Sequence, residues 1–158
     1  MVRIEADHEV VVGVDGSEES IEALRYAGTL APFLNATLHV ITTWDYPAAD
    51  PLLMPFGSGE FADVTRRDLN RALVAAYGYE TPPRLRTTVV FARPARALLE
   101  ASRHAALLIV GRRGNGRVPV RGLGSVSSAC VSRAQCPVLV VPRRLADGEE
   151  VVPRTAKL

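Results

Sequence analysis

Short apolar runs alternate with stretches of helical periodicity along this sequence, and that alternation constrains the fold more than any other feature. Runs rich in β-branched residues and without polar alternation are typical of strands buried on both faces of a sheet. Four runs have this character, namely residues 10–14, 37–41, 107–110 and 138–141. A fifth run, residues 85–91, carries Arg86 and two threonines, so we interpret it as an edge strand.

Between these runs, apolar residues recur at spacings of three and four, which is the period of an amphipathic helix. Ser17 can cap the first helix, Pro94 begins the third, and Ser125 can cap the fourth. The expected inward positions are Ile21, Leu24, Ala27, Ala31 and Leu34; Phe61, Val64, Leu69, Leu73 and Ala76; Leu98 and Ala101; and Val126, Ala129, Cys130 and Ala134. The order β-α-β-α-β-α-β-α-β predicts a doubly wound, Rossmann-like α/β domain whose parallel sheet is covered by helices on both faces.

Two segments fall outside this alternation. Residues 44–60 contain three prolines and two glycines, which predicts a long loop after the second strand. Residues 143–158 have mixed charge and no period, and we expect a mobile tail after a single domain of residues 1–142. No apolar run reaches the roughly 18 residues that a membrane helix needs, so we expect a cytoplasmic protein with no membrane partner.

Residues 111–124 are the densest chemical feature, with five of the twelve glycines, four arginines and no acid. Glycines let backbone amides approach and converge on an anion. Gly124-Ser125 then leads into a helix, whose first turn presents free N–H groups, and Ser125 and Ser127 add hydroxyl donors. The alternative is that residues 111–124 form a flexible, solvated surface loop. The place of this segment between a buried strand and a helix N-terminus favours phosphate binding instead.

A second candidate lies at the end of the first strand, in Val14-Asp15-Gly16-Ser17. Asp15 there suits ribose hydroxyls or a water-bound metal, and Ser17 suits either a phosphate contact or the helix cap alone. In a doubly wound sheet the strand order commonly reverses between the first and fourth strands. Asp15 and Gly111 are therefore expected to face each other across the crevice at that point.

The basic residues exclude several functions. All but one of the 19 are arginine, and the exception is Lys157, so a Schiff base or a phosphate-loop lysine has no candidate inside the fold. A net charge of +2 is too small to indicate nucleic-acid binding. His39 is expected to be a hydrogen-bonded strand histidine rather than a catalytic base, and the two cysteines, Cys130 and Cys136, are expected to be packing residues.

The segments VVVGVDGSEES, LLIVGRRG, GLGSVS and CPVLVVP resemble the universal stress protein family, and the resemblance runs from Glu9 to Pro142. The nucleotide motif of that family is a glycine, two residues, a glycine, nine residues, a glycine, then serine or threonine. Gly111, Gly114, Gly124 and Ser125 match its spacing. The resemblance implies the ATP-binding branch of the family, a five-stranded sheet of order 3-2-1-4-5, and a homodimer.

Transferred to this chain, the resemblance places Asp15 near the ribose and Gly13 beneath the adenine, with Val40 reading the base through its backbone. Trp44 either forms one side of the adenine site or has only a packing role in the loop. The phosphates would lie against Gly111, Gly114, Gly124, Ser125, Val126 and Ser127. Two departures from the family pattern are Ala106 before the fourth run and the pair Arg112 and Arg113 after Gly111. Both leave the motif spacing intact, so we expect them to tune the affinity for the ligand, with Arg112 among the ligand-binding residues.

We therefore expect an ATP-binding regulatory or signalling protein of stress responses, with Mg²⁺ carried by the triphosphate and with no catalytic residue or protein-held metal. A ligand such as AMP or cyclic AMP, or slow ATP hydrolysis, remains an alternative. A phosphoacceptor receiver domain and a phosphate-loop ATPase are disfavoured because the lysine of each and the GxxxxGK pattern are missing. Residues 138–141, at the sheet edge, are the expected homodimer contact. The protein partner is unknown.

Overall fold

The computed structural model describes residues 8–45, 58–115 and 122–144. Strands and helices alternate strictly along these segments, as the spacing of the apolar runs predicts. The elements are β1 (Glu9–Gly13), α1 (Glu18–Phe33), β2 (Thr37–Trp44), α2 (Ser58–Tyr77), β3 (Leu85–Phe91), α3 (Pro94–Ala101), β4 (Ala105–Gly111), α4 (Ser125–Arg133) and β5 (Val138–Val141).

The five strands form one sheet in the order β3-β2-β1-β4-β5, and every pairing is parallel. This order confirms the doubly wound α/β fold. The chain runs outward from β1 through β2 to β3, then crosses back to place β4 on the other side of β1. β3 and β5 are the two edge strands, as the sequence predicts. The reversal between β1 and β4 opens a crevice at their carboxyl ends.

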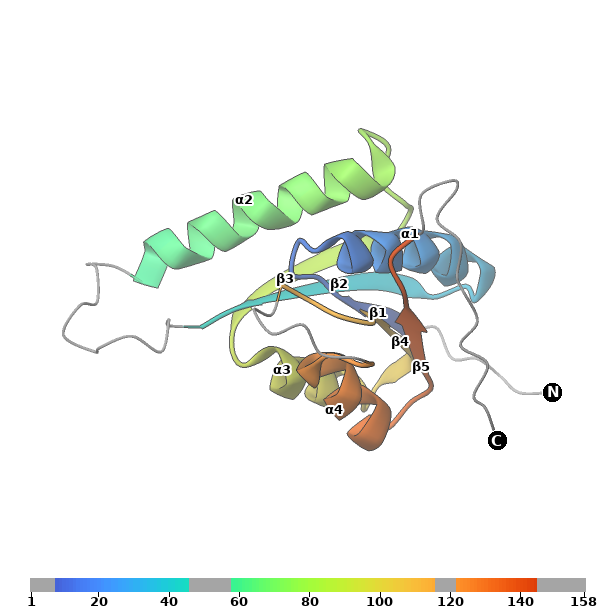
Figure 1. Cartoon of the computed structure of the whole chain (residues 1–158). Coiled ribbons are helices and arrows are strands. Elements are labelled where there is room, and N and C mark those ends of the chain that lie inside the picture. The colour runs from blue at the N-terminus through green and yellow to red at the C-terminus, as the bar shows by residue number, and fades with distance from the viewer. Residues whose placement is uncertain (1–7, 46–57, 116–121, 145–158) are drawn as a thin grey trace, which may run out of the picture.

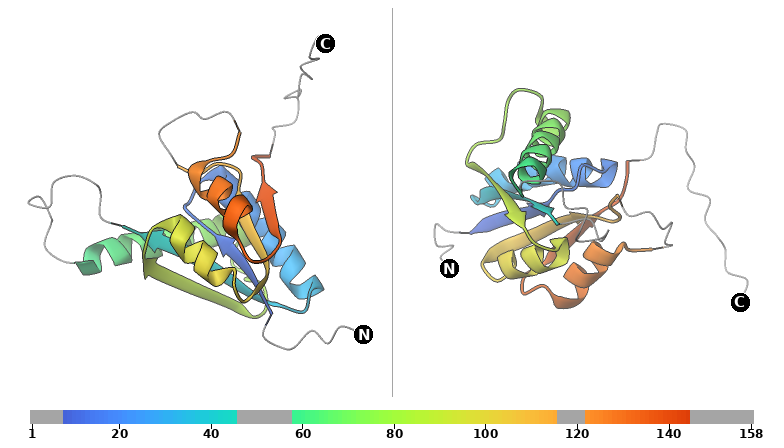
Figure 2. Two further views of the ribbon diagram at one scale, coloured as in Figure 1. Left: turned by 90° about the horizontal axis from the view of Figure 1, so that it is seen from below. Right: turned by 90° about the vertical axis from the view of Figure 1, so that its left-hand side faces the viewer.

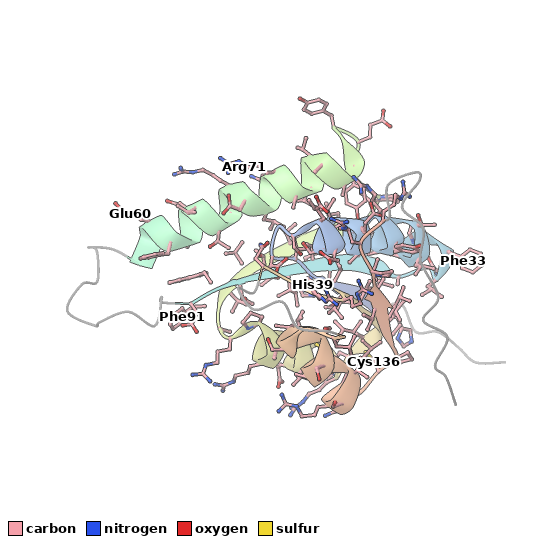
Figure 3. All side chains as sticks on the ribbon, in the orientation of Figure 1. Phe33, His39, Glu60, Arg71, Phe91 and Cys136 are labelled. Atoms are coloured by element: carbon pink, nitrogen blue, oxygen red, sulfur yellow. The ribbon has the colours of Figure 1, made fainter. Side chains whose placement is uncertain are left out.

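The helices cover the two faces of the sheet in pairs, α1 with α2 on one face and α3 with α4 on the other (Figures 1 and 2). Alternate residues of each strand face opposite sides, so each strand supplies both cores. In β1, Val10 and Val12 pack toward α1, whereas Val11 packs toward α3 and α4, and all three are fully buried. Polar residues occupy the outer side of the helices, where Arg71 of α2 points away from the sheet (Figure 3).

The inward positions of the helices follow the predicted period with one exception. Leu24, Ala27 and Ala31 of α1 are fully buried, and Leu98 of α3 is also buried. Val64 of α2 was expected to be inward, but it is 50% exposed. The helix packs through Leu69 and its neighbours, and five residues correspond to about 140° around a helix, so Val64 lies away from that contact.

The boundaries of the predicted loop at residues 44–60 are partly wrong. β2 continues to Trp44, because Thr42, Thr43 and Trp44 pair with the last three residues of β3. α2 begins at Ser58, three residues before the first inward position that the sequence indicated. The rest of that loop, residues 46–57, lies outside the described residues, and so do residues 145–158 of the predicted tail.

Candidate functional site

A cavity of about 730 Å³ opens at the carboxyl ends of β1 and β4, where the strand order reverses. We call it the glycine-loop cavity. It brings together residues from the first strand and its turn, from β2, from α3, and from the segment between β4 and α4. The lining residues used below are Gly13, Asp15, Ser17, Ile41, Thr43, Pro94, Leu98, Val110, Gly111, Arg113, Gly114, Asn115, Gly124, Ser125, Val126 and Ser127.

The turn after β1 forms one wall of the cavity. Gly16 has φ +82°, a conformation that residues with a Cβ rarely adopt, and this lets the chain turn sharply into α1. Asp15 Oδ1 accepts hydrogen bonds from the Ser17 amide at 3.0 Å and from the Ser17 hydroxyl at 2.5 Å. The Ser17 Oγ in turn accepts from the Ser20 amide at 3.2 Å, which makes Ser17 the N-cap of α1. The structure thus confirms the capping role of Ser17.

The turn after β4 is tied to this wall across the crevice. The Asn115 amide donates to Asp15 Oδ2 at 2.8 Å, and the Asn115 side chain donates to the Asp15 carbonyl at 2.7 Å. Sequence reasoning missed Asn115, because its partner lies 100 residues earlier in the chain. Its place directly after the motif residue Gly114 was the one available signal. Position 114 has room only for glycine, because a Cβ there would overlap Asp15 Oδ2.

The N-terminus of α4 forms the facing wall. The N-cap is Gly124, with extended backbone angles, rather than the predicted Ser125, because the Ser128 amide donates to the Gly124 carbonyl and so closes the first helical turn. The amides of Ser125, Val126 and Ser127 therefore have no intrahelical acceptor and carry the positive end of the helix dipole. These three amides and the exposed Ser125 hydroxyl border the cavity.

The Ser127 hydroxyl has a different role from the predicted one. It donates to the Arg112 carbonyl at 2.7 Å, and the same carbonyl accepts from the Gly124 amide at 2.8 Å. These two bonds fasten the start of α4 to the end of β4. The hydroxyl thus positions the loop, and only the backbone amide of Ser127 is left to face a ligand.

Gly111 of the motif and Gly13 of β1 allow the close packing that shapes the cavity. A Cβ on Gly111 would lie 2.8 Å from Glu19 Cβ and 2.9 Å from the Glu19 carbonyl carbon, so α1 could not approach β4. A Cβ on Gly13 would lie 2.7 Å from a methyl group of Leu98. Leu98 belongs to α3 and lines the cavity from that side. Gly111 is therefore needed for helix–sheet packing, whereas a side chain on Gly13 would require only that Leu98 move.

Two predicted positions, Val40 and Arg112, are absent from the described lining of the cavity. Val40 is fully buried and packs in the core beneath α1, whereas its neighbours Ile41 and Thr43 line the cavity. Arg112 uses its backbone to hold the loop, and its Nε is buried with no hydrogen-bond partner among the described residues. Arg113 lines the cavity instead, and its Nε donates to the Gly122 carbonyl at 3.1 Å. Arg117 and Arg121 lie outside the described residues.

Trp44 packs against aromatic rings outside the glycine-loop cavity. Its ring lies 6.5 Å from that of Phe61 in a stacked arrangement and 4.7 Å from that of Phe91 in a tilted one. Trp44 is absent from the described lining of that cavity. Of its two interpretations, the structure favours packing.

The thiols are poor nucleophiles in this fold. Burial raises the pKa of Cys130 to about 11 and also raises the pKa of Cys136, so both stay protonated at neutral pH. Within residues 8–45, 58–115 and 122–144, no group of three His, Cys, Asp or Glu side chains is arranged to hold a metal ion. No helix in these segments is long and apolar enough to cross a membrane.

Comparison with known proteins agrees with this architecture. Residues 8–142 match the model of the universal stress protein family. A universal stress protein of Mycobacterium tuberculosis is 35% identical over 142 residues, which cover 85% of this chain and 48% of that protein. One from Thermus aquaticus is 34% identical over 84% of this chain and 96% of its own length. The chain thus spans about half the length of the mycobacterial relative and nearly all of the other.

A solved structure extends the comparison to three dimensions. It is described as a universal stress protein in complex with cAMP, and it is 30% identical, with a TM-score of 0.61, over 89% of this chain and all of that one. Sequence, fold and the glycine-loop cavity thus lead to one conclusion: the chain belongs to the universal stress protein family.

Proposed function

We propose that this chain binds ATP in the glycine-loop cavity and acts as a nucleotide-dependent regulator of stress responses in the cytoplasm. The observation that carries the proposal is the convergence of unpaired α4 amides with the Gly111–Gly114 turn in one cavity. A phosphate chain lying there would meet backbone donors, the helix dipole and the Arg113 side chain. The cavity needs no lysine to bind phosphate, in keeping with a fold that holds none in its described segments.

The other end of the cavity suits a nucleoside. Ile41, Pro94, Leu98 and Val110 offer an apolar surface on which a flat base can lie. Asp15 lines the same cavity, and we propose that a ribose lies beside it. Its carboxylate already accepts from Ser17 and Asn115, so a ribose hydroxyl would share or displace those bonds.

The lining favours binding over rapid turnover. Phosphoryl transfer needs a group that positions or deprotonates the nucleophile, and usually fixed metal ligands. Asp15 is the sole carboxylate among the described lining residues, and both its oxygens are engaged in the two turns. We therefore propose a ligand that changes conformation or partner choice, with Mg²⁺ carried by the triphosphate and hydrolysis slow if it occurs.

A monophosphate is the second candidate. The relative solved with cAMP has the same fold, and a cyclic monophosphate would satisfy the α4 amides without reaching the Gly114 turn. The proposed phosphate donors lie both in the Gly111–Gly114 turn and at the N-terminus of α4, which favours a longer phosphate chain. Direct competition between the ligands decides between the two.

We also propose a homodimer through β5. Val138–Val141 is an edge strand with partly buried apolar side chains, and its outer edge pairs with no strand among the described residues. A second β5 would satisfy those backbone groups and cover the side chains. Sedimentation at micromolar concentration tests this: a monomer contradicts the dimer and leaves the nucleotide proposal standing.

Calorimetry on protein stripped of bound nucleotide tests the function. We expect ATP to bind more tightly than ADP, AMP or cAMP, and Gly114→Ala to weaken that binding strongly because the new methyl group displaces the Asp15 carboxylate. Gly59→Ala is the matched control, since a Cβ there meets nothing within 4 Å. Failure of the wild type to bind any of the four nucleotides would overturn the proposal. Tighter binding of cAMP would replace ATP with the monophosphate.

A further inference from the structure

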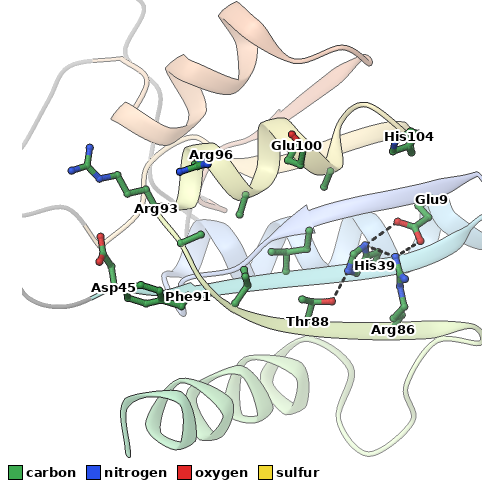
Figure 4. Close-up of a pocket in the computed structure, with 15 residues that line it drawn as sticks. Glu9, His39, Asp45, Arg86, Thr88, Phe91, Arg93, Arg96, Glu100 and His104 are labelled. Carbon is green, nitrogen blue, oxygen red and sulfur yellow. Dashed lines mark hydrogen bonds and ion pairs between the residues drawn. The ribbon is translucent and has the colours of Figure 1, made fainter. Parts of the chain in front are cut away.

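A larger cavity, of about 1040 Å³, lies on the same face of the sheet between β3 and α3. We call it the α3–β3 cavity (Figure 4). Its floor is apolar and is formed by Ile41 and Val90, and Phe91 lines the cavity at the end of β3. Its wall includes Ala97 and Ala101 of α3, whose small side chains leave space above the edge strand. The motif residues of the glycine loop do not line this cavity.

One end of the cavity is closed by a polar cluster whose members already satisfy one another. His39 Nδ1 lies 2.9 Å from Glu9 Oε2 and 2.9 Å from Arg86 Nη2, and His39 Nε2 lies 2.8 Å from Thr88 Oγ1. Arg86 also forms an ion pair with Glu9. Burial lowers the pKa of His39, an effect that the bond to Glu9 partly opposes, so the ring is neutral near pH 7. An anion gains little here, because Glu9 already balances Arg86.

The opposite end carries unmatched positive charge. Arg93, the N-cap of α3, and Arg96, in its first turn, form no hydrogen bond or ion pair with any residue that the structure describes. Both line the cavity, and Figure 4 shows them at the start of α3, with Arg93 extending away from Phe91. Asp45 borders the same end, so the two arginines outnumber the acid there. Glu100, farther along α3, is paired with Arg103 at 3.4 Å. The cavity is therefore positive at the start of α3, apolar along its floor and neutral at its far end.

We propose that the α3–β3 cavity is a second ligand site, which takes a small organic anion with an apolar body, such as a medium-chain carboxylate. Arg93 and Arg96 hold the carboxylate, and the body lies along Phe91, Val90 and Ile41 toward Thr88. The distance from Phe91 to Thr88 along the strand is about 10 Å, which sets the length of the body. This site is independent of nucleotide binding, although Ile41 borders both cavities.

Octanoate is the probe, and Trp44 reports its binding. Trp44 is the only tryptophan of the chain, and its ring lies 4.7 Å from that of Phe91, which lines the cavity at the end of β3. Octanoate should change the tryptophan fluorescence saturably, whereas octylamine, with the same body and opposite charge, should bind at least about tenfold more weakly. No saturable signal with octanoate up to millimolar concentration would overturn the proposal, and so would equal binding of octylamine.

Two variants locate the site. The double variant R93Q/R96Q should weaken octanoate binding about tenfold and leave octanol binding unchanged, because it removes the charge and keeps the floor. Ala97→Phe should abolish binding of both by filling the cavity. Gly114→Ala should impair ATP binding and leave octanoate binding intact, so the two proposals fail separately. Unchanged octanoate affinity in R93Q/R96Q, with circular dichroism like that of the wild type, would contradict the assignment.

Discussion

The two cavities lie on the same face of one sheet but are built from different parts of the chain. The glycine-loop cavity is made largely by backbone: Gly111, Gly114 and the first amides of α4 approach closely because few side chains intervene. The α3–β3 cavity is made by side chains, with a charged cluster at one end and two arginines at the other. The glycine-loop cavity therefore has little room for added side-chain atoms, whereas the ligand preference of the α3–β3 cavity depends on the charged side chains around it.

This difference explains why the glycine-loop cavity can be predicted from the sequence and the α3–β3 cavity cannot. A cavity formed by backbone requires glycines, and here they occur at fixed spacing within one short segment. The α3–β3 cavity draws Glu9, His39, Arg86 and Arg93 from separate elements, and no spacing connects them. The following experiments test the contrast, starting with the largest expected effect.

Gly111→Ala should cause the largest loss. The added Cβ would lie within 3 Å of Glu19 backbone and side-chain atoms, so α1 or β4 must shift. We expect a decrease of about 2 kcal/mol in the free energy of unfolding, measured by urea denaturation. Gly59→Ala, on exposed helix, should stay within about 1 kcal/mol of the wild type. Equal stability of the two variants would show that close backbone packing does not shape the glycine-loop cavity.

Asp15→Ala should weaken ATP binding about tenfold or more, because it removes the acceptor shared by both turns and the proposed acceptor for a ribose hydroxyl. Isothermal titration calorimetry measures the change. Asn115→Ala removes the side-chain bond to the Asp15 carbonyl but keeps the carboxylate, so its effect should be smaller. A larger effect for Asn115→Ala would mean that closure of the turns, rather than the carboxylate, determines affinity.

Arg113→Met and Arg112→Met form a matched pair with a smaller expected difference. Arg113 lines the glycine-loop cavity and Arg112 does not, so the first variant should weaken ATP binding about threefold and the second should leave it unchanged. Methionine preserves the packing of the aliphatic stem. The reverse order of effects, in the same calorimetric assay, would restore the original expectation for Arg112.

The smallest expected effect is a change in the titration of His39. Burial lowers its folded pKa below the usual value of 6.5, so the neutral ring contributes stability above that pH, and this contribution is lost as the pH falls through the folded pKa. Glu9→Gln removes the partner that raises the pKa, so His39 should titrate at a still lower pH. Proton NMR of the imidazole resonances measures both values. A His39 pKa above 6.5 in the wild type would contradict the neutral end of the α3–β3 cavity.

Much of the fold was predictable because local patterns and tertiary packing agree. The apolar runs gave β5 and β3 with their bounds, and Ser17 and Pro94 marked the starts of α1 and α3. Errors arose where a distant partner decided the outcome. Trp44 joins β2 because β3 lies beside it, Gly124 replaces Ser125 as the cap because the chain stays extended at Gly124, and Val64 turns outward because α2 packs through a different line of residues.

The sequence by itself determined the strand–helix alternation, the glycine spacing from Gly111 to Ser125, and the family, because each is recorded in contiguous residues. Only the tertiary structure decided that Asn115 binds Asp15, that the Ser127 hydroxyl fastens the loop, and that Arg113 rather than Arg112 faces the glycine-loop cavity. It alone also placed Arg93 and Arg96 across an apolar floor from His39. These contacts depend on which distant strands become neighbours in the sheet, and local sequence does not record that arrangement.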